Sequence, residues 1–96
     1  MAGYVLTPLA RADLQDIWNY TVERWGWAQA ERYMREIQET VALLALSPGL
    51  GRSCDEIRAG YFKFPAGTHV IYFRRRNSKT EIVRILHQRM DVERHL

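Results

Sequence analysis

Two amphipathic helical patterns that meet at a single glycine constrain this chain more than any other feature. Apolar residues recur with the roughly 3.6-residue period of a helix from Thr7 to Trp25, and again from Trp27 to Ala45. Gly26, which lies between them, is the residue type that best accepts a left-handed helix end. Two helices joined by one residue must fold back on each other, so the sequence predicts an antiparallel helical hairpin.

The start of the first helix and the buried sides of the hairpin are also predictable. Thr7 is expected to cap the helix, and Pro8 suits the first helical position. Trp18, Trp25 and Trp27 lie on the apolar sides, so we expect all three to pack in the core. The other residues of these sides are Ala10, Leu14, Ile17 and Thr21, then Ala30, Tyr33, Met34, Ile37, Val41, Leu44 and Ala45.

After a loop at residues 48–55 the hydrophobic period changes to about 2, which is typical of β-strands. Strands are predicted at 57–64, 68–76 and 81–87, with turns at 65–67 and 77–79, and 4–6 is predicted to form an edge strand. The short links predict an antiparallel meander. The expected fold is α+β in the order β-α-α-β-β-β, with a helical hairpin on one face of a small antiparallel sheet, and residues 1–96 form a single domain.

One hairpin covers only one face of such a sheet, so the other face is expected to be open. On the last strand, alternation groups Ile82, Arg84 and Leu86 on one face, and Val83 and His87 on the other. Because an arginine in mid-strand favours water, the face with Arg84 is predicted to be the open one. Apolar side chains beside an arginine on an open sheet indicate a surface that binds a partner.

Composition excludes several classes of protein. A chain of 96 residues with 47% hydrophobic residues is not disordered, and no apolar run reaches the roughly 18 residues of a membrane span. The single cysteine, Cys54, excludes an internal disulfide and a cysteine-built zinc site. The first residues lack the basic and apolar regions of a signal peptide, so we expect a cytoplasmic protein with no membrane partner.

Charge is concentrated in the second half of the chain. Residues 1–48 carry four arginines and six acidic residues, a net of −2, whereas residues 49–96 carry ten basic and five acidic residues, a net of +5. The asymmetry suggests an acidic partner, either a nucleic acid or an acidic protein segment, although a solvated face explains it equally well. Residues 74–76, three arginines at a strand end, either bind a partner or keep an edge soluble. Direct DNA reading is disfavoured because no recognition helix accompanies them.

The residues suited to acid–base chemistry do not form a recognisable constellation. His87 is expected at the margin of the helix-packed face, His69 begins a strand and His95 lies in the last residues. No carboxylate pair, catalytic triad or metal-ligand cluster can be identified, so no metal or cofactor is expected. These observations argue against an enzyme.

Four apolar residues of the hairpin point away from its buried sides. Single exposed apolar residues are ordinary in soluble proteins. Four on one hairpin suggest a second buried surface, which another chain would supply. These residues are Tyr20, Val22, Leu43 and Leu46.

Five segments in the right order resemble ParE toxins over essentially the whole chain. The run from Leu6 to Trp18, LTPLARADLQDIW, resembles the first helix of that family, and Trp25-Gly26 followed by Ala30 and Tyr33 resembles its helix junction. The third segment joins Pro48-Gly49-Leu50-Gly51-Arg52 to Asp55–Tyr61. The fourth is His69–Tyr72, and the fifth is Ile82–Asp91 with its tail His87-Gln88-Arg89-Met90-Asp91.

The resemblance implies a type II toxin of the ParE/RelE superfamily. ParE-like toxins act on DNA gyrase, whereas RelE-like toxins cleave mRNA on the ribosome with basic and acid–base side chains. Lys63, Arg74 and His87 are the candidate catalytic residues under this alternative. The tail has the ParE form and no acid–base pair accompanies it, so inhibition of gyrase by binding is favoured.

The resemblance also implies a partner. The partner is a ParD-like antitoxin, which is a ribbon-helix-helix dimer that binds DNA. The two proteins are expected to form a toxin–antitoxin hetero-oligomer, in which the toxin contacts operator DNA only indirectly, through the antitoxin. Its flexible segment is expected to fold upon binding. The candidate antitoxin-binding residues are Tyr20, Val22, Leu43, Leu46, Ile82, Arg84 and Leu86, and the candidate target-binding residues are Arg84, Arg89, Met90 and Arg94.

Overall fold

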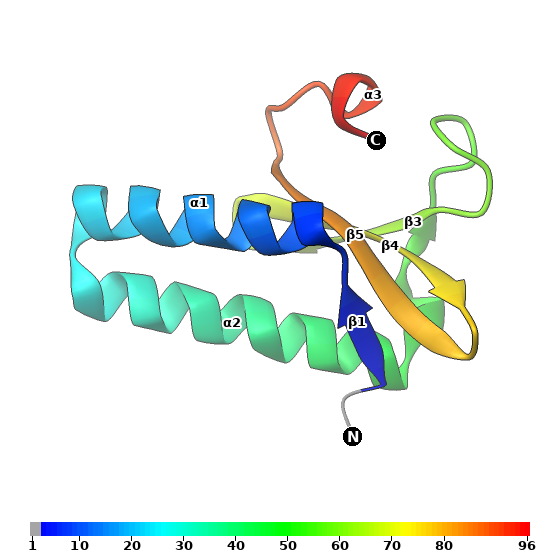
Figure 1. Cartoon of the computed structure of the whole chain (residues 1–96), viewed down its shortest axis with the longest axis horizontal. Coiled ribbons are helices and arrows are strands. Elements are labelled where there is room, and N and C mark those ends of the chain that lie inside the picture. Colours follow the sequence, from blue (N-terminus) through cyan, green and yellow to red (C-terminus); the bar gives the residue numbers. More distant parts are fainter. Residues whose placement is uncertain (1–2) are drawn as a thin grey trace.

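The predicted helical hairpin is present in the computed structural model, which describes residues 3–96 (Figure 1). Helix α1 (Pro8–Trp25) begins at Thr7, whose side-chain oxygen accepts the N–H of Ala10 at 3.0 Å. Gly26, with φ of 90°, joins it to helix α2 (Trp27–Leu46). The N-cap and the glycine junction are therefore as the sequence indicates.

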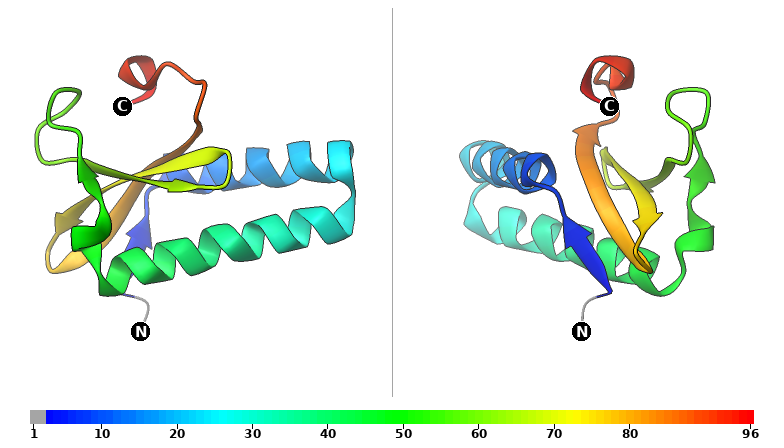
Figure 2. Two further views of the ribbon diagram at one scale, coloured as in Figure 1. Left: turned by 180° about the vertical axis from the view of Figure 1, so that it is seen from behind. Right: turned by 45° about the vertical axis from the view of Figure 1, so that its right-hand side comes forward.

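A five-stranded sheet packs against the hairpin (Figures 1 and 2). Its strands are β1 (Tyr4–Leu6), β2 (Arg52–Ser53), β3 (Phe62–Ala66), β4 (His69–Arg76) and β5 (Lys79–His87), in the spatial order β1-β5-β4-β3-β2. The α+β fold is confirmed, and β1 is an edge strand as expected. However, β1 runs parallel to β5, so the sheet is only mostly antiparallel.

The segment predicted as one strand at residues 57–64 is mostly a loop. Residues 54–61 close on themselves, because the N–H of Cys54 donates to the carbonyl of Tyr61 and Asp55 accepts the N–H of Gly60. Gly60, at φ of 83°, permits this closure. A short 3₁₀ helix, η1 (Pro48–Leu50), precedes β2. The next strand, β3, continues through Pro65 to Ala66 and so includes two residues of the turn predicted at 65–67.

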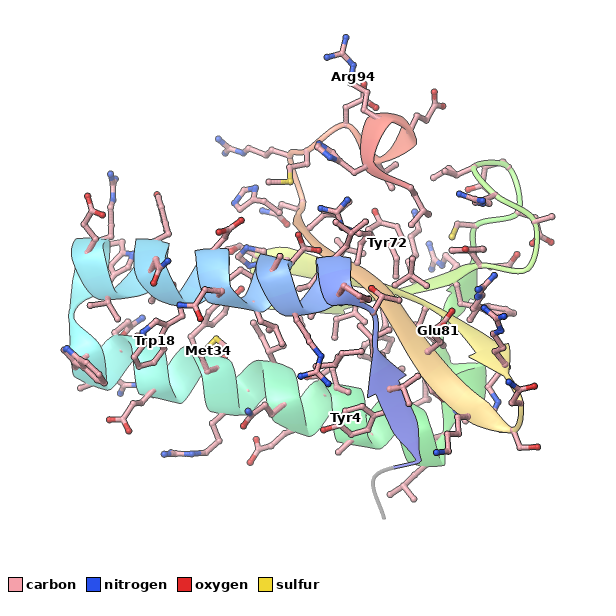
Figure 3. All side chains as sticks on the ribbon, in the orientation of Figure 1. Tyr4, Trp18, Met34, Tyr72, Glu81 and Arg94 are labelled. Carbon is pink, nitrogen blue, oxygen red and sulfur yellow. The ribbon has the colours of Figure 1, made fainter. Side chains whose placement is uncertain are left out.

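The main core lies between the hairpin and the sheet. Phe73 and Ile71 of β4 are fully buried there against Ile37 and Leu44 of α2. Met34 packs against the same cluster, between the two helices (Figure 3). No helix among residues 3–96 has the length and apolar character needed to cross a membrane.

A β-bulge in β5 reverses the alternation on which the face prediction depended. Tyr72 pairs with Arg84 but Phe73 pairs with Ile82, so Val83 is the extra residue. Both Ile82 and Ile85 therefore belong to the core under the helices. The prediction that Ile82 lies on an open face is wrong, since Ile82 is fully buried.

The face of the sheet opposite the helices is not open either. Tyr72 and Leu86 pack there in a second apolar cluster with Cys54 and Tyr61 of the 54–61 loop. Val92 and Leu96 of the last segment, which contains helix α3 (Val92–His95), pack against the same cluster. Leu86 is only 2% exposed, so the prediction that it is available to a partner is also wrong.

The hairpin extends past the sheet, which leaves its tip uncovered (Figure 1). Trp25 and Trp27, predicted to be buried, are exposed at 65% and 66%. The ring of Trp27 packs edge-to-face with Trp18, with centroids 5.0 Å apart. Periodicity identified the correct sides of the helices, but no strand of the described chain lies beneath the last turn of α1 and the first turn of α2 (Figure 1).

Candidate functional site

A pocket of about 680 Å³ opens where the hairpin meets the start of β4 and the end of β5. Its outer walls include the exposed side chains of Tyr20, Trp25 and Met90. We call it the hairpin pocket, lined by Asp16, Ile17, Tyr20, Thr21, Trp25, Gln29, Tyr33, Thr68, His69, His87 and Met90. An apolar pocket that also contains a few polar groups is the usual form of a binding site.

The polar groups of the hairpin pocket are centred on Tyr33. Its hydroxyl lies 2.6 Å from Nδ1 of His69, accepts the N–H of Thr68 at 3.1 Å and lies 3.2 Å from the carbonyl oxygen of Ala66. Gly67, at φ of 61°, makes this approach possible, because a Cβ there would lie 2.5 Å from the tyrosine ring. The tight β3–β4 turn thus positions Tyr33 against His69.

His87 completes this group from the neighbouring strand. It pairs directly with His69 across β4 and β5, and the two rings are 5.3 Å apart and nearly perpendicular. Nδ1 of His87 accepts the N–H of Arg89 at 3.1 Å. The location of His87 at the margin of the helix-packed face is as predicted.

Sequence reasoning missed three residues of this pocket. His69 was judged to have no partner, and Tyr33 and Trp25 were assigned to the core. A count outward from the turn at residues 77–78 places His69 opposite Leu86, and only the bulge at Val83 moves it opposite His87. The pairing of His69 with His87 could have been predicted only from the position of the bulge, and no residue type in β5 indicates that position.

Burial and the neighbouring His87 lower the pKa of His69 to about 4. The nearby Asp13 acts weakly in the opposite direction, and Tyr33 contacts the ring. In the unfolded chain a histidine has a pKa near 6.5, so the unfolded state binds a proton that the folded state does not. We expect the free energy of unfolding to fall as pH falls from about 6.5 to about 4, and to be independent of this group above about 6.5.

Urea denaturation of the wild type and of His69→Asn at a series of pH values tests this expectation. Asparagine keeps an acceptor near Tyr33 but does not titrate, so the variant should lose part of the pH dependence. The difference between the two proteins cancels the carboxylates, which also titrate near pH 4. Identical slopes would contradict the expectation.

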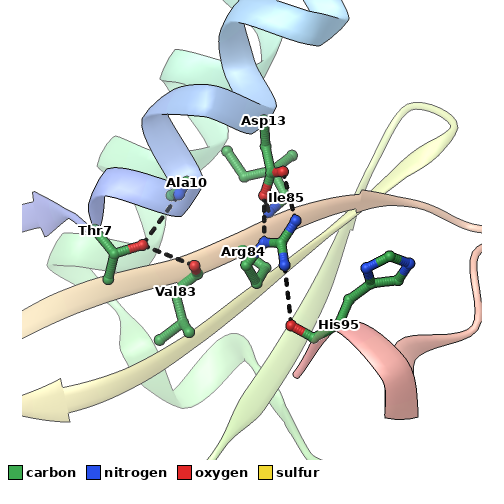
Figure 4. Close-up of polar contacts among 7 residues, drawn as sticks. All are labelled: Thr7, Ala10, Asp13, Val83, Arg84, Ile85 and His95. Atoms are coloured by element: carbon green, nitrogen blue, oxygen red, sulfur yellow. Dashed lines mark hydrogen bonds and ion pairs between the residues drawn. The ribbon is translucent and has the colours of Figure 1, made fainter.

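Arg84, predicted to contact partners, instead holds the first helix to the sheet (Figure 4). Its Nε and Nη2 donate to the two carboxylate oxygens of Asp13, both at 2.8 Å, and its Nη1 donates to the backbone oxygen of His95 at 3.0 Å. Asp13 also accepts the N–H of Ile85 at 2.9 Å, on the edge of β5 where β1 has ended and no other strand within residues 3–96 takes its place. The Arg84 side chain is 14% exposed, so it is not free to bind a partner.

The four hairpin residues predicted to bind a partner lie in different places. Tyr20 is 61% exposed beside the hairpin pocket, and Val22 is half-buried. Leu43 and Leu46, near the end of α2, are exposed at 44% and 84%. The four residues therefore form two separate apolar patches. Tyr20 and Val22 lie near the tip of the hairpin, and Leu43 and Leu46 lie at its other end.

The remaining candidate target contacts are exposed. Arg89 has no ion-pair partner within residues 3–96, and Met90 is 49% exposed. Arg94 projects from α3 away from the sheet, and its nearest acid is Asp91 at 3.6 Å (Figure 3). These three residues line one end of the molecule without packing in its core.

The three candidate catalytic residues are not brought together. Lys63 pairs with Tyr72 and so lies on the face opposite the helices, as does Arg74, whose guanidinium lies over the ring of Tyr61. Arg74 is also bonded to Glu81 at 2.6 Å, which raises its pKa. His87 lies on the helix-packed face, in the hairpin pocket. The sheet thus separates the histidine from both cations.

The part of the chain described, residues 3–96, contains no group of three His, Cys, Asp or Glu residues placed to hold a metal ion. Burial raises the pKa of the Cys54 thiol, which lies fully inside the second apolar cluster. This cysteine is therefore poorly suited to act as a nucleophile.

Residues 4–92 match the family model described as the ParE toxin of the type II toxin-antitoxin system parDE. The chain belongs to the ParE toxin family. It is 50% identical over 94 residues to Toxin ParE1 of Mycobacterium tuberculosis, covering 97% of this chain and 96% of that protein. It is 44% identical over 96 residues to Toxin ParE1 of Caulobacter vibrioides, covering 100% and 99%.

A solved structure has the same fold. The protein is described as the chromosomal ParDE TA system from P. aeruginosa, and it superposes with a TM-score of 0.77 over 88% of this chain and 92% of that chain. Its sequence is 23% identical, so the likeness concerns the fold alone. The fold class predicted from the hydrophobic periods and the toxin family predicted from the five segments are confirmed.

Proposed function

We propose that this ParE toxin inhibits DNA gyrase by binding it and is neutralised by a ParD-like antitoxin. The observation that carries the proposal is the match to ParE toxins over nearly the whole length of both chains. The resemblance to that branch of the superfamily implies gyrase rather than the ribosome as the target.

The arrangement of the candidate catalytic residues supports binding without chemistry. Cleavage of RNA requires a cation beside the phosphate and an acid–base group within hydrogen-bond distance of the reacting atoms. Lys63 and Arg74 lie on one face of the sheet and His87 on the other. The ribosome-dependent ribonuclease alternative therefore has less support than the gyrase proposal.

Target contact is best assigned to Arg89, Met90 and Arg94, because all three are exposed. Removal of residues 90–96 is a poor test, since Val92 and Leu96 pack on the sheet. We expect Arg89→Glu with Arg94→Glu to raise the toxin concentration that inhibits supercoiling by purified gyrase about tenfold or more. Arg32→Glu with Arg35→Glu, two exposed positions on α2, is the matched charge control. An equal effect from the two pairs would remove this end of the molecule from the target surface.

Antitoxin contact is best assigned to the exposed hairpin residues Tyr20, Leu43 and Leu46, together with the half-buried Val22. The resemblance implies a ParD-like ribbon-helix-helix protein whose flexible segment folds on the toxin. The buried Ile82 and Leu86 and the paired Arg84 are not part of this surface.

We expect Leu43→Glu with Leu46→Glu to weaken antitoxin binding about tenfold or more in calorimetry, because the apolar area buried by the partner is lost. The fold should persist, since both side chains are exposed. Arg32→Gln with Arg35→Gln changes the net charge by the same amount on the same helix and should bind normally. An affinity unchanged from the wild type would exclude this end of α2 from the interface.

A further inference from the structure

The paired imidazoles of the hairpin pocket each have one nitrogen, Nε2, that makes no hydrogen bond within the described chain. Nδ1 of His69 is occupied by the Tyr33 hydroxyl and Nδ1 of His87 by the N–H of Arg89. Neither Nε2 atom has a hydrogen-bond partner within the described chain, and no side-chain polar atom there is both buried and unpartnered. Both Nε2 atoms are therefore accessible from solvent, in residues that line the pocket.

The chemistry of this pair favours a hydrogen-bond acceptor as its ligand. Because Nδ1 of His87 accepts a backbone N–H, the neutral ring carries its proton on Nε2. A protonated Nε2 donates a hydrogen bond and cannot coordinate a metal ion. Arg89, exposed and free of an ion pair in residues 3–96, follows within two positions of His87 and adds positive charge.

We propose that His69 and His87 receive a carboxylate side chain of the antitoxin segment that folds on this toxin. This inference rests on the proposed pairing with a ParD-like antitoxin. The exposed walls formed by Tyr20, Trp25 and Met90 accept the apolar residue next to that carboxylate. An acidic segment suits the chain as a whole, since residues 49–96 have ten basic against five acidic residues.

Other charged groups around the pocket restrict where the carboxylate lies. Asp16 lines the pocket from α1 and repels a second acid there. Asp13 is held by Arg84, and the Tyr33 hydroxyl contacts Nδ1 of His69. The carboxylate therefore binds at the end formed by β4 and β5, beside Arg89, and not at the α1 end.

Burial and His87 hold the pKa of His69 at about 4 in the free toxin, and a carboxylate bound beside its ring favours the protonated form, so association takes up a proton at His69. Protonated His69 keeps its contact with Tyr33, because its Nδ1–H can donate to the tyrosine oxygen. Aspartates and glutamates with ordinary pKa values stay ionised between about pH 5.5 and about pH 7.5, so the carboxylate of the partner keeps its charge over this range. We expect the wild type to bind its ParD-like antitoxin about tenfold more tightly at the lower pH.

Two sets of variants separate the charge from the hydrogen bond. His69→Asn and His87→Asn keep an acceptor where Nδ1 lies and remove Nε2, so both should lose affinity, and His69→Asn should also lose the pH dependence. His69→Gln and His87→Gln keep a neutral donor where Nε2 lies, so both should retain more affinity than the asparagine variants, and His69→Gln should lose the pH dependence. His95→Asn, an exposed histidine outside the pocket, should behave as the wild type.

Calorimetry of the wild-type pair in two buffers of different ionisation enthalpy measures proton uptake without any variant. Uptake at about pH 6.5 that disappears in His69→Gln supports the proposal. Binding with no proton uptake and equal affinity at both pH values would overturn the histidine site and leave the antitoxin surface at Leu43 and Leu46 standing. Absence of any binding by the wild type would overturn both.

Discussion

Asp13→Ala should lower the free energy of unfolding by about 3–5 kcal/mol, because it leaves a largely buried guanidinium without its counter-ion. Three hydrogen bonds end on this carboxylate, two from Arg84 and one from the N–H of Ile85. They hold α1 to β5 where β1 ends, so their loss also removes the only protein partner of that backbone N–H among residues 3–96. Urea denaturation followed by circular dichroism measures the change.

Three companion variants show whether the effect comes from the ion pair. Asp16→Ala, on the exposed side of the same helix, should change stability by less than about 0.5 kcal/mol. Asp13→Asn should lie between the wild type and Asp13→Ala, and Arg84→Met should recover part of the loss when added to Asp13→Ala. A decrease in the free energy of unfolding below about 1 kcal/mol for Asp13→Ala would contradict this prediction, because it would show that the Arg84 guanidinium can move into solvent.

Phe73→Ala is expected to be equally severe, at about 3–5 kcal/mol, because Phe73 is fully buried at the centre of the sheet. The ring stacks against Phe62 with centroids 5.9 Å apart. It also reaches Gly51, where an added Cβ would lie 2.3 Å from the ring. The space released by Phe73→Ala is therefore bounded in part by the backbone of Gly51.

The pair of positions gives a sharp test of this contact. Gly51→Ala alone should cost about 1–3 kcal/mol, since the buried ring cannot move aside. In the Phe73→Ala background the same substitution should cost much less, because the clash with the ring is gone and only the contact with Cβ of Phe62 at 3.2 Å remains. Additive effects in the denaturation series would show that Gly51 and Phe73 do not constrain each other.

The helical hairpin could be predicted from sequence because all of its signals are local. Thr7, Pro8 and Gly26 each act within one helical turn, and the apolar period is long enough to identify both helices. The exposure of Trp25 and Trp27 could not be predicted in this way. It depends on where the sheet ends beneath the hairpin, which is a property of the packed layers.

The face of Ile82 was predicted incorrectly for a definite reason, whereas His87 lies on the face predicted for it. Val83 is an ordinary strand residue, and nothing in the sequence marks it as the bulge that carries Ile82 and Ile85 to the same face. The covering of the opposite face was missed because the 54–61 loop resembles a strand in composition. The pairing of His69 with His87 depends on the same bulge, so the histidine pair of the hairpin pocket could not be predicted from the sequence either.

Residues predicted to be exposed from helical period are exposed more often than residues predicted to be exposed from strand alternation. Tyr20, Leu43 and Leu46 are on the surface, whereas Ile82 and Leu86 are buried and Arg84 is committed to Asp13. A single inserted residue reverses a period of 2, but several residues are needed to rotate a helical side. Surface assignments made from helices are accordingly the more secure basis for the proposed antitoxin contacts.

We propose that this toxin acts by binding gyrase and not by cutting RNA. The most direct measurement adds the purified toxin in parallel to a gyrase supercoiling reaction without ribosomes and to a ribosome-containing translation reaction with a defined mRNA. We expect the toxin to inhibit supercoiling, the ParD-like antitoxin to restore it, and the translated mRNA to stay intact. Normal supercoiling together with cleaved mRNA, lost when His87 is replaced, would contradict it.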